Sequence, residues 1–191
     1  MLLYAFSTAL GREEENSARN AYETCKTSMG HFVDKDGYCY WLTTNESIWM
    51  ESEAECNRMG AHLASFSSLE TMHAVAKAFE VSNTLWVGGV KGIGYIAEAT
   101  PNKVSSANMD GWFWVDGTGM IEKQLWWPTE EPNNCISSYC GQEGEFCANL
   151  YTRINPTTLP TEGALNDANC FMFQSTGLCS ISSKGGNKEN M

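Results

Sequence analysis

The chain has 191 residues, of which 42% are hydrophobic, so it is long enough for one globular domain with a buried core. It carries 23 acidic and 12 basic residues, which give a net charge of −11. Such a surface repels nucleic acids and anionic lipids, and the sequence has no basic patch, so we expect neither as a partner. The longest uncharged apolar stretch, residues 1–11, is far shorter than the roughly 20 residues that cross a bilayer, so we expect no membrane insertion.

The cysteines indicate the compartment. There are eight, an even number, with no Cys-x-x-Cys pair, and the three histidines are scattered at His31, His62 and His73. These spacings disfavour a zinc site or a thioredoxin-like centre. We therefore expect four disulfides, an oxidising compartment and a secreted, extracellular protein. Residues 1–11 then fit the remnant of a signal peptide.

The first predicted elements follow an acidic segment. Residues 12–24 contain three consecutive glutamates and no apolar periodicity, so we expect a solvated leader. Residues 37–42 are rich in aromatic residues and predict a strand. Residues 47–59 predict a helix that Gly60 ends. One face of this helix carries Trp49, Ser52, Cys56 and Met59.

A second helix is expected to begin at Ser67, because Glu70 lies three residues later and would complete a capping box. Residues 85–89 and 112–117 then predict two short strands, the first meeting two glycines and the second ending in a turn. The buried stripe of the second helix is predicted to contain Leu69, Met72, His73, Ala76 and Phe79.

Two long segments have little predicted regular structure. These are residues 91–109 and residues 118–146, and the second contains Pro128, Pro132 and two cysteines that favour an ordered loop. Loops of this length inside a compact domain are usually functional or disordered. The order of strand, two helices, strands, long loop and further strands indicates an α+β fold, with helices beside a mostly antiparallel sheet.

Several separated motifs occur in a fixed order between residues 25 and 181. They are the segments 49–56, 60–66 (GAHLASF), 85–89 (LWVGG), 114–117 (WVDG), 131–134 (EPNN), 145–147 (EFC) and 166–170 (NDANC), followed by Cys179. Together they resemble the C-type lectin-like domain. The resemblance implies two helices beside a mostly antiparallel sheet, with a long calcium-binding loop. Residues 182–191, rich in Ser, Gly, Lys and Asn, would form a flexible tail.

The resemblance also implies how the cysteines pair, which their spacing alone leaves open. It pairs Cys56 with Cys179 and Cys147 with Cys170, and the longer form of the family adds a terminal bridge, here Cys25 with Cys39. Cys135 with Cys140 would close a small loop that the minimal pattern of the family lacks. This last pair lies beside the residues that carry the resemblance to a binding site.

Five side chains form the predicted site, with three carboxylates and two amide oxygens. They are Glu131, Asn133, Glu145, Asn166 and Asp167. Calcium prefers six to eight oxygen ligands of this kind, whereas magnesium requires a stricter octahedron, so the sequence predicts a calcium site. Three carboxylates would repel one another without the ion and would be stabilised by it.

In sugar-binding members of the family, the same positions bind calcium and two neighbouring sugar hydroxyls. The resemblance therefore implies that four residues both hold calcium and bind carbohydrate: Glu131, Asn133, Glu145 and Asn166. The Glu-Pro-Asn order resembles the mannose-type subset, which selects mannose, N-acetylglucosamine or fucose. The family pattern also implies a cis peptide before Pro132 and places Leu165 where most members have tryptophan. For Trp126 and Trp127, which precede the site, packing under the loop and stacking on a sugar face are left open as alternatives.

We therefore predict a secreted, calcium-dependent lectin that recognises mannose-type glycans. The alternative is a lectin-fold module that binds another protein, with calcium only ordering the loop. A glycosidase using Glu131 and Glu145 is disfavoured, because one carboxyl would need to hold a proton while the metal needs both ionised, so we predict no enzyme activity. Binding at one shallow site is weak, and a homo-oligomer would supply avidity.

Overall fold

The computed structural model describes residues 16–17, 19–27, 31–79, 84–121, 126–152, 163–172 and 174–183. The expected signal-peptide remnant, residues 1–11, lies outside the described residues, and so does most of the expected tail, from residue 184 onward. Among the described helices, none is both long enough and apolar enough to cross a membrane.

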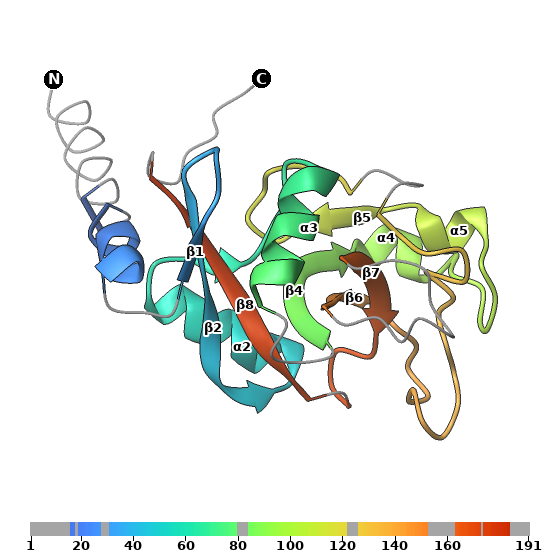
Figure 1. Ribbon diagram of the computed structural model, residues 1–191. Helices are drawn as coiled ribbons and strands as arrows, with labels where there is room; N and C mark the ends of the chain where they lie inside the picture. Colours follow the sequence, from blue (N-terminus) through green and yellow to red (C-terminus); the bar gives the residue numbers. More distant parts are fainter. Residues whose placement is uncertain are drawn as a thin grey trace, which may run out of the picture.

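Eight strands form one sheet in the described part of the chain (Figure 1). Its main path is β1-β2-β8-β4-β6-β7, with β3 paired to β8 and β5 paired to β4. The pairs are antiparallel except for β4 and β8, which run parallel. The strands are β1 (His31–Val33), β2 (Tyr38–Ser47), β3 (His62–Leu63), β4 (Thr84–Lys91), β5 (Trp112–Trp114), β6 (Cys147–Tyr151), β7 (Ala164–Ala168) and β8 (Ser175–Ser182). The predicted mostly antiparallel sheet is confirmed.

Two longer helices pack on this sheet, α2 (Trp49–Arg58) and α3 (Leu69–Ala78). Both were predicted, the first from its periodic apolar face and the second from its cap. The segment between β4 and β5, predicted to be irregular, contains two single-turn helices, α4 (Ile93–Ile96) and α5 (Ser106–Met109).

The predicted start of α3 is wrong by one residue. Ser68 is the N-cap, because its hydroxyl accepts a hydrogen bond from the Thr71 amide at 3.1 Å, while Ser67 is not used as the cap. Glu70, expected to close a capping box, forms an ion pair with Lys35 instead. His73 is exposed, so the predicted buried stripe was also wrong at that position.

The core consists of two apolar clusters, one on each face of the sheet. Successive residues of a strand point to opposite faces, so Tyr40 joins one cluster and Trp41 the other. In β4, Leu85 and Trp86 divide in the same way. The helix α3 covers the first cluster and α2 the second. The predicted core tryptophans, Trp49, Trp86, Trp112 and Trp114, are all buried.

Trp126 and Trp127 both belong to the core, so of the two alternatives left open for them the structure shows packing under the loop. Each is only 7% exposed. The Trp126 ring packs edge-on against Trp114, and the Trp127 ring lies 4.8 Å from that of Trp112, centroid to centroid. The two side chains therefore support the base of the loop that follows them.

Four disulfides link the elements, with the pairing that the resemblance implied. They are Cys25–Cys39, Cys56–Cys179, Cys135–Cys140 and Cys147–Cys170. The first ties a helical segment, residues 19–27, to β2. Tyr22 in that segment is 9% exposed and packs in the second cluster, so part of the expected solvated leader is attached to the domain.

Candidate functional site

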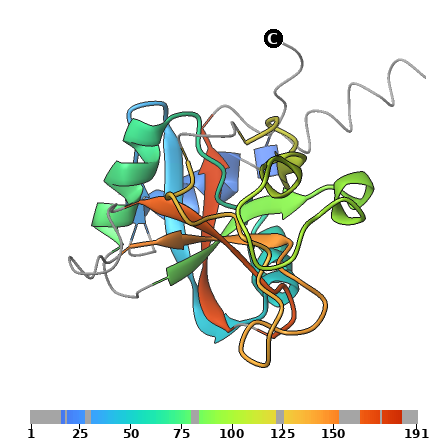
Figure 2. The ribbon, with the colours of Figure 1, turned by 90° about the vertical axis from the view of Figure 1, so that its right-hand side faces the viewer.

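The five predicted site residues come from a loop and from two neighbouring strands. Glu131 and Asn133 lie in the loop before β6, on either side of Pro132, and the peptide before Pro132 is cis, as the family pattern implied. Glu145 stands two residues before β6, while Asn166 and Asp167 lie in β7. Since β6 and β7 pair antiparallel, the end of the loop lies beside the end of β7 (Figure 2).

Asp167 holds the loop against the sheet. Asp167 is buried, with only 1% of its surface exposed. One carboxylate oxygen accepts a hydrogen bond from the Asn133 amide at 3.1 Å, and the other accepts from the Asn134 amide at 2.7 Å. A buried carboxylate on a strand thus fixes the backbone of two consecutive loop residues.

A reciprocal pair of hydrogen bonds closes the loop around Glu145. The Glu145 side chain accepts from the Cys135 amide at 2.8 Å, and the Glu145 amide donates to the Asn134 side-chain oxygen at 2.9 Å. Asn134 has a φ of 50°, a left-handed conformation that asparagine tolerates better than most residues. Asn134 is therefore a structural residue of the site, which the sequence analysis did not identify.

The three carboxylates lie in one electrostatic environment. Burial, together with the charges of Asp167 and Glu145, raises the pKa of Glu131 to about 9. Burial and the Asp167 charge raise the pKa of Glu145 to about 8. The pKa of Asp167 is also raised by burial, although the Asn134 and Asn133 amides oppose the shift. The site favours protons on these groups and would favour a cation in their place.

The donor chemistry of the site fits a calcium ion. Two of the predicted ligands carry a buried oxygen with no hydrogen-bond partner, Oε2 of Glu131 and Oδ1 of Asn133. Unpaired buried oxygens are unfavourable, and a hard cation would satisfy them. Among the described residues, no group of three His, Cys, Asp or Glu side chains is arranged to hold a metal ion.

The structure connects four of the five predicted residues directly and the fifth through a neighbour. Glu131, Asn133, Glu145 and Asp167 are joined by the hydrogen bonds and charge interactions above. Asn166 is attached through Asp167, because its side-chain amide donates to the Asp167 carbonyl at 2.6 Å.

A second segment supports the loop from outside. The Asn102 amide donates to the Asn134 carbonyl at 3.1 Å, and the Lys103 amide donates to the Asn133 carbonyl at 2.9 Å. The Asn102 side chain also accepts a hydrogen bond from the Ile136 amide at 2.8 Å. The sequence analysis did not find these contacts, and only the proline-asparagine turn at residues 101–102 hints at them.

A buried lysine fixes this supporting segment. Lys91 at the end of β4 is 5% exposed, and its ammonium donates to the carbonyls of Ala107, Asn108 and Asp110 at 2.7–2.9 Å. Burial lowers its pKa to about 8, against the charges of Asp167 and Asp110. The Asn108 side chain in turn donates to the Lys103 carbonyl at 2.8 Å, so the hydrogen bonds run from Lys91 to the loop.

Comparison with known proteins places these features in one family. Residues 45–180 match a family model described as "Lectin C-type domain". Human C-type lectin domain family 4 member E is 27% identical over 135 residues, 70% of this chain and 50% of that protein. The type-2 ice-structuring protein of Brachyopsis segaliensis is 32% identical over 104 residues, 54% of this chain and 51% of that protein.

The fold is also similar to that of solved structures. The carbohydrate-recognition domain of the human scavenger receptor C-type lectin superimposes with a TM-score of 0.56 at 21% identity, over 80% of this chain and 96% of that domain. The chain spans about half the length of the two curated relatives named above.

Proposed function

Because the chain belongs to the C-type lectin domain family, whose members are generally non-enzymatic carbohydrate-binding modules, we propose that it binds mannose-type glycans in a calcium-dependent manner. The observation that carries the proposal is the pair of unpaired buried oxygens on Glu131 and Asn133, beside two further carboxylates. Calcium would be held by Glu131, Asn133, Glu145, Asn166 and Asp167, and would supply direct coordination to sugar hydroxyls.

The side chains themselves supply the selectivity. Carboxylates accept hydrogen bonds from sugar hydroxyls, and asparagine amides donate to them. Glu131 and Asn133 are separated by one proline, so an acceptor and a donor stand in a fixed order along the loop. This order is that of the mannose-type subset, which supports mannose, N-acetylglucosamine or fucose as the ligand.

We also propose that the protein is secreted. Four disulfides among eight cysteines are typical of an oxidising compartment. The described residues form one candidate calcium and sugar site per chain. We propose that a homo-oligomer supplies useful affinity for a glycan surface, because linked sites bind with avidity.

A second candidate is a lectin-fold module that binds a protein surface, with calcium only ordering the loop. Three exposed large apolar side chains, one in the loop before β6 and two after β7, favour it: Tyr139 is 91% exposed, Phe171 60% and Met172 54%. The ice-structuring relative is named for a ligand other than a sugar, so the fold alone does not determine the ligand.

A glycan array with calcium and with a chelator separates the two candidates. We expect binding to mannose-type glycans only with calcium, and competition on immobilised mannan by mannose and N-acetylglucosamine but not by galactose. Binding to galactose alone would contradict the mannose assignment. Retention of calcium with no binding to any glycan would favour the protein-binding module.

A further inference from the structure

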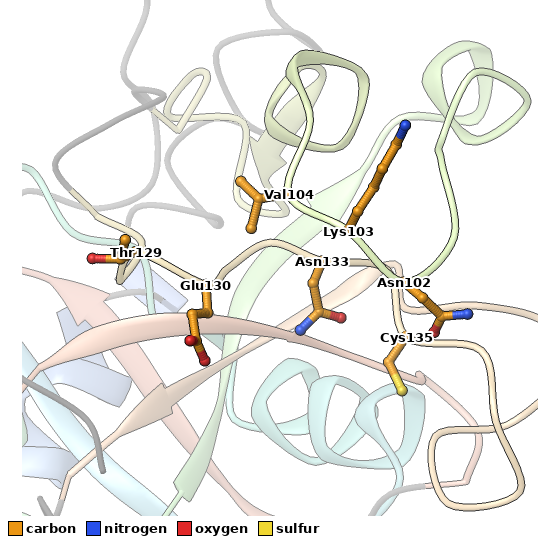
Figure 3. A pocket seen from close by; sticks show the side chains of 7 residues that line it. All are labelled: Asn102, Lys103, Val104, Thr129, Glu130, Asn133 and Cys135. Carbon is orange, nitrogen blue, oxygen red and sulfur yellow. The ribbon is translucent and has the colours of Figure 1, made fainter. Parts of the chain in front are cut away.

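A hollow of about 400 Å³ lies immediately beside the proposed site. Ligand pockets in proteins usually measure roughly 300–1,000 Å³, so this one has room for a small ligand. Its walls are two segments far apart in the sequence, and in Figure 3 Asn133 stands between Glu130 and Asn102. The lining residues are Asn102, Lys103, Val104, Thr129, Glu130, Asn133 and Cys135.

The hollow shares one residue with the proposed site, and backbone hydrogen bonds fix its two walls relative to each other. Asn133 lines the hollow and is also one of the predicted calcium and sugar ligands. The two walls are tied by the bonds from the Asn102 and Lys103 amides to the Asn134 and Asn133 carbonyls. A group attached to a sugar at the proposed site therefore has a preformed surface within reach.

The lining has the mixed character that a pyranose ring requires. Val104, 36% exposed, offers an apolar surface for the C–H face of a ring. Asn102, Thr129 and Glu130 offer an amide, a hydroxyl and a carboxylate to its hydroxyl groups. Lys103 and Glu130 carry opposite charges and both line the hollow, so its lining has no net charge.

We propose that this hollow is a second saccharide subsite, which binds the uncharged residue linked to the sugar at the calcium site. The inference rests on the proposed function and adds that the ligand is a neutral oligosaccharide of at least two residues. An acidic sugar is disfavoured, because the net charge of −11 of the chain would repel it.

The test compares methyl α-mannoside with the 2-, 3- and 6-linked mannobioses as competitors for immobilised mannan. We expect at least one mannobiose to bind about tenfold more tightly, roughly the gain from one or two additional hydrogen bonds. Val104→Trp would fill the hollow, and this advantage should then fall below about twofold while binding of methyl α-mannoside is kept.

The matched control is Val33→Trp. Val33 is 37% exposed, as Val104 is, but lies in β1 at the other end of the sheet path. It should keep the preference for the mannobiose. Glu130→Ala, with Glu51→Ala in α2 as its control, repeats the test at an exposed residue in case Val104→Trp does not fold. Glu130→Ala should also reduce the advantage of the mannobiose.

Three outcomes would overturn the inference. If every mannobiose binds like methyl α-mannoside, the subsite is absent and the proposed function still holds. If Val104→Trp loses methyl α-mannoside binding while Val33→Trp keeps it, the hollow is not separate from the first site. If calcium binds but neither mannose nor mannobiose does, the inference and the proposed function both fail.

Discussion

At the scale of single residues, Glu131 and Asn133 are the two that we expect to determine sugar preference. Both have a buried oxygen without a partner, and both stand beside the buried Asp167 carboxylate. Their order along the chain determines which side offers an acceptor and which a donor to a bound hydroxyl. Sugar preference should therefore depend on this order, whereas calcium binding should depend only on the number of oxygens.

The double substitution Glu131→Gln with Asn133→Asp reverses the order and keeps the total charge and size. We expect mannose binding to weaken about tenfold or more, since at least one hydrogen bond to each hydroxyl is mismatched. Calcium should still bind, because one carboxylate and one amide remain, and some galactose binding should appear. Competition by both sugars on immobilised mannan measures the change. Glu51→Gln, at an exposed position of α2, is the control, and equal mannose binding in the double variant would contradict the assigned roles.

The titration of the same carboxylates predicts how stability depends on pH without calcium. The pKa values of Glu131 and Glu145 are raised from 4.5 to about 9 and about 8. Their contribution to stability is therefore fully present below the unfolded pKa and is lost as the pH rises through 8 to 9. We expect the Tm of the chelated protein to fall between pH 5 and pH 9, and calcium to oppose the fall.

Glu131→Gln combined with Glu145→Gln supplies the control for this pH dependence. Without the two titrating groups, the Tm of the chelated variant should change less between pH 5 and pH 9 than that of the unaltered protein. Scanning calorimetry with chelator measures both curves. Parallel curves for the two proteins would show that other charged groups cause the dependence.

At the scale of elements, the start of α3 shows what a local pattern cannot decide. Ser67 and Ser68 are adjacent, and either hydroxyl can cap a helix. Ser68 is the cap, and the Ser67 hydroxyl lies 3.3 Å from the Asp36 carboxylate, in a turn more than thirty residues earlier. The presence of the helix could be read from periodicity, but its first residue depends on this tertiary contact.

The candidate site also has some features that the sequence predicts and others that depend on tertiary contacts. The residues that meet there could be named because they occur in ordered motifs, while their role as ligands stays a prediction, and the disulfides could be predicted because the family pattern assigns them. The support by Asn102 and Lys91 could not be predicted, since it consists of hydrogen bonds to backbone carbonyls of segments that are distant in the sequence. The roles of Trp126 and Trp127 stayed open for the same reason, because the sequence of two adjacent aromatic residues before a loop does not reveal that both rings are buried.

We expect the side chain of Lys91 to hold in place the segment between β4 and β5 that supports the loop. Lys91→Met keeps the length of the side chain but removes three hydrogen bonds to the carbonyls of residues 107–110. Loss of buried hydrogen bonds to a charged group should lower the free energy of unfolding by about 2–4 kcal/mol. Urea denaturation measures this change. Lys77→Met, at an exposed position of α3, should change it little, and equal effects of the two substitutions would contradict the role of Lys91.

At the scale of the whole molecule, two of the four disulfides differ most in what they connect: one joins distant elements and the other closes a small loop beside the site. Cys56–Cys179 connects α2 to β8 across 123 positions, and both sulfurs are in the buried core. Cys135–Cys140 spans only five positions, within the loop beside Glu145. Bridges that close longer loops constrain the unfolded chain more strongly.

Removing each bridge should therefore affect a different property of the molecule. Replacing Cys56 and Cys179 by alanine should lower the free energy of unfolding by about 5 kcal/mol, against about 2 kcal/mol for the same change at Cys135 and Cys140. Calcium affinity should follow the opposite order, because the Cys135 amide donates to the Glu145 carboxylate and the short bridge holds that segment. Urea denaturation and calcium titration of both variants, at a temperature where each is folded, measure the two properties. Calcium affinity that falls in proportion to stability in both variants would show that the short bridge has no separate effect on the site.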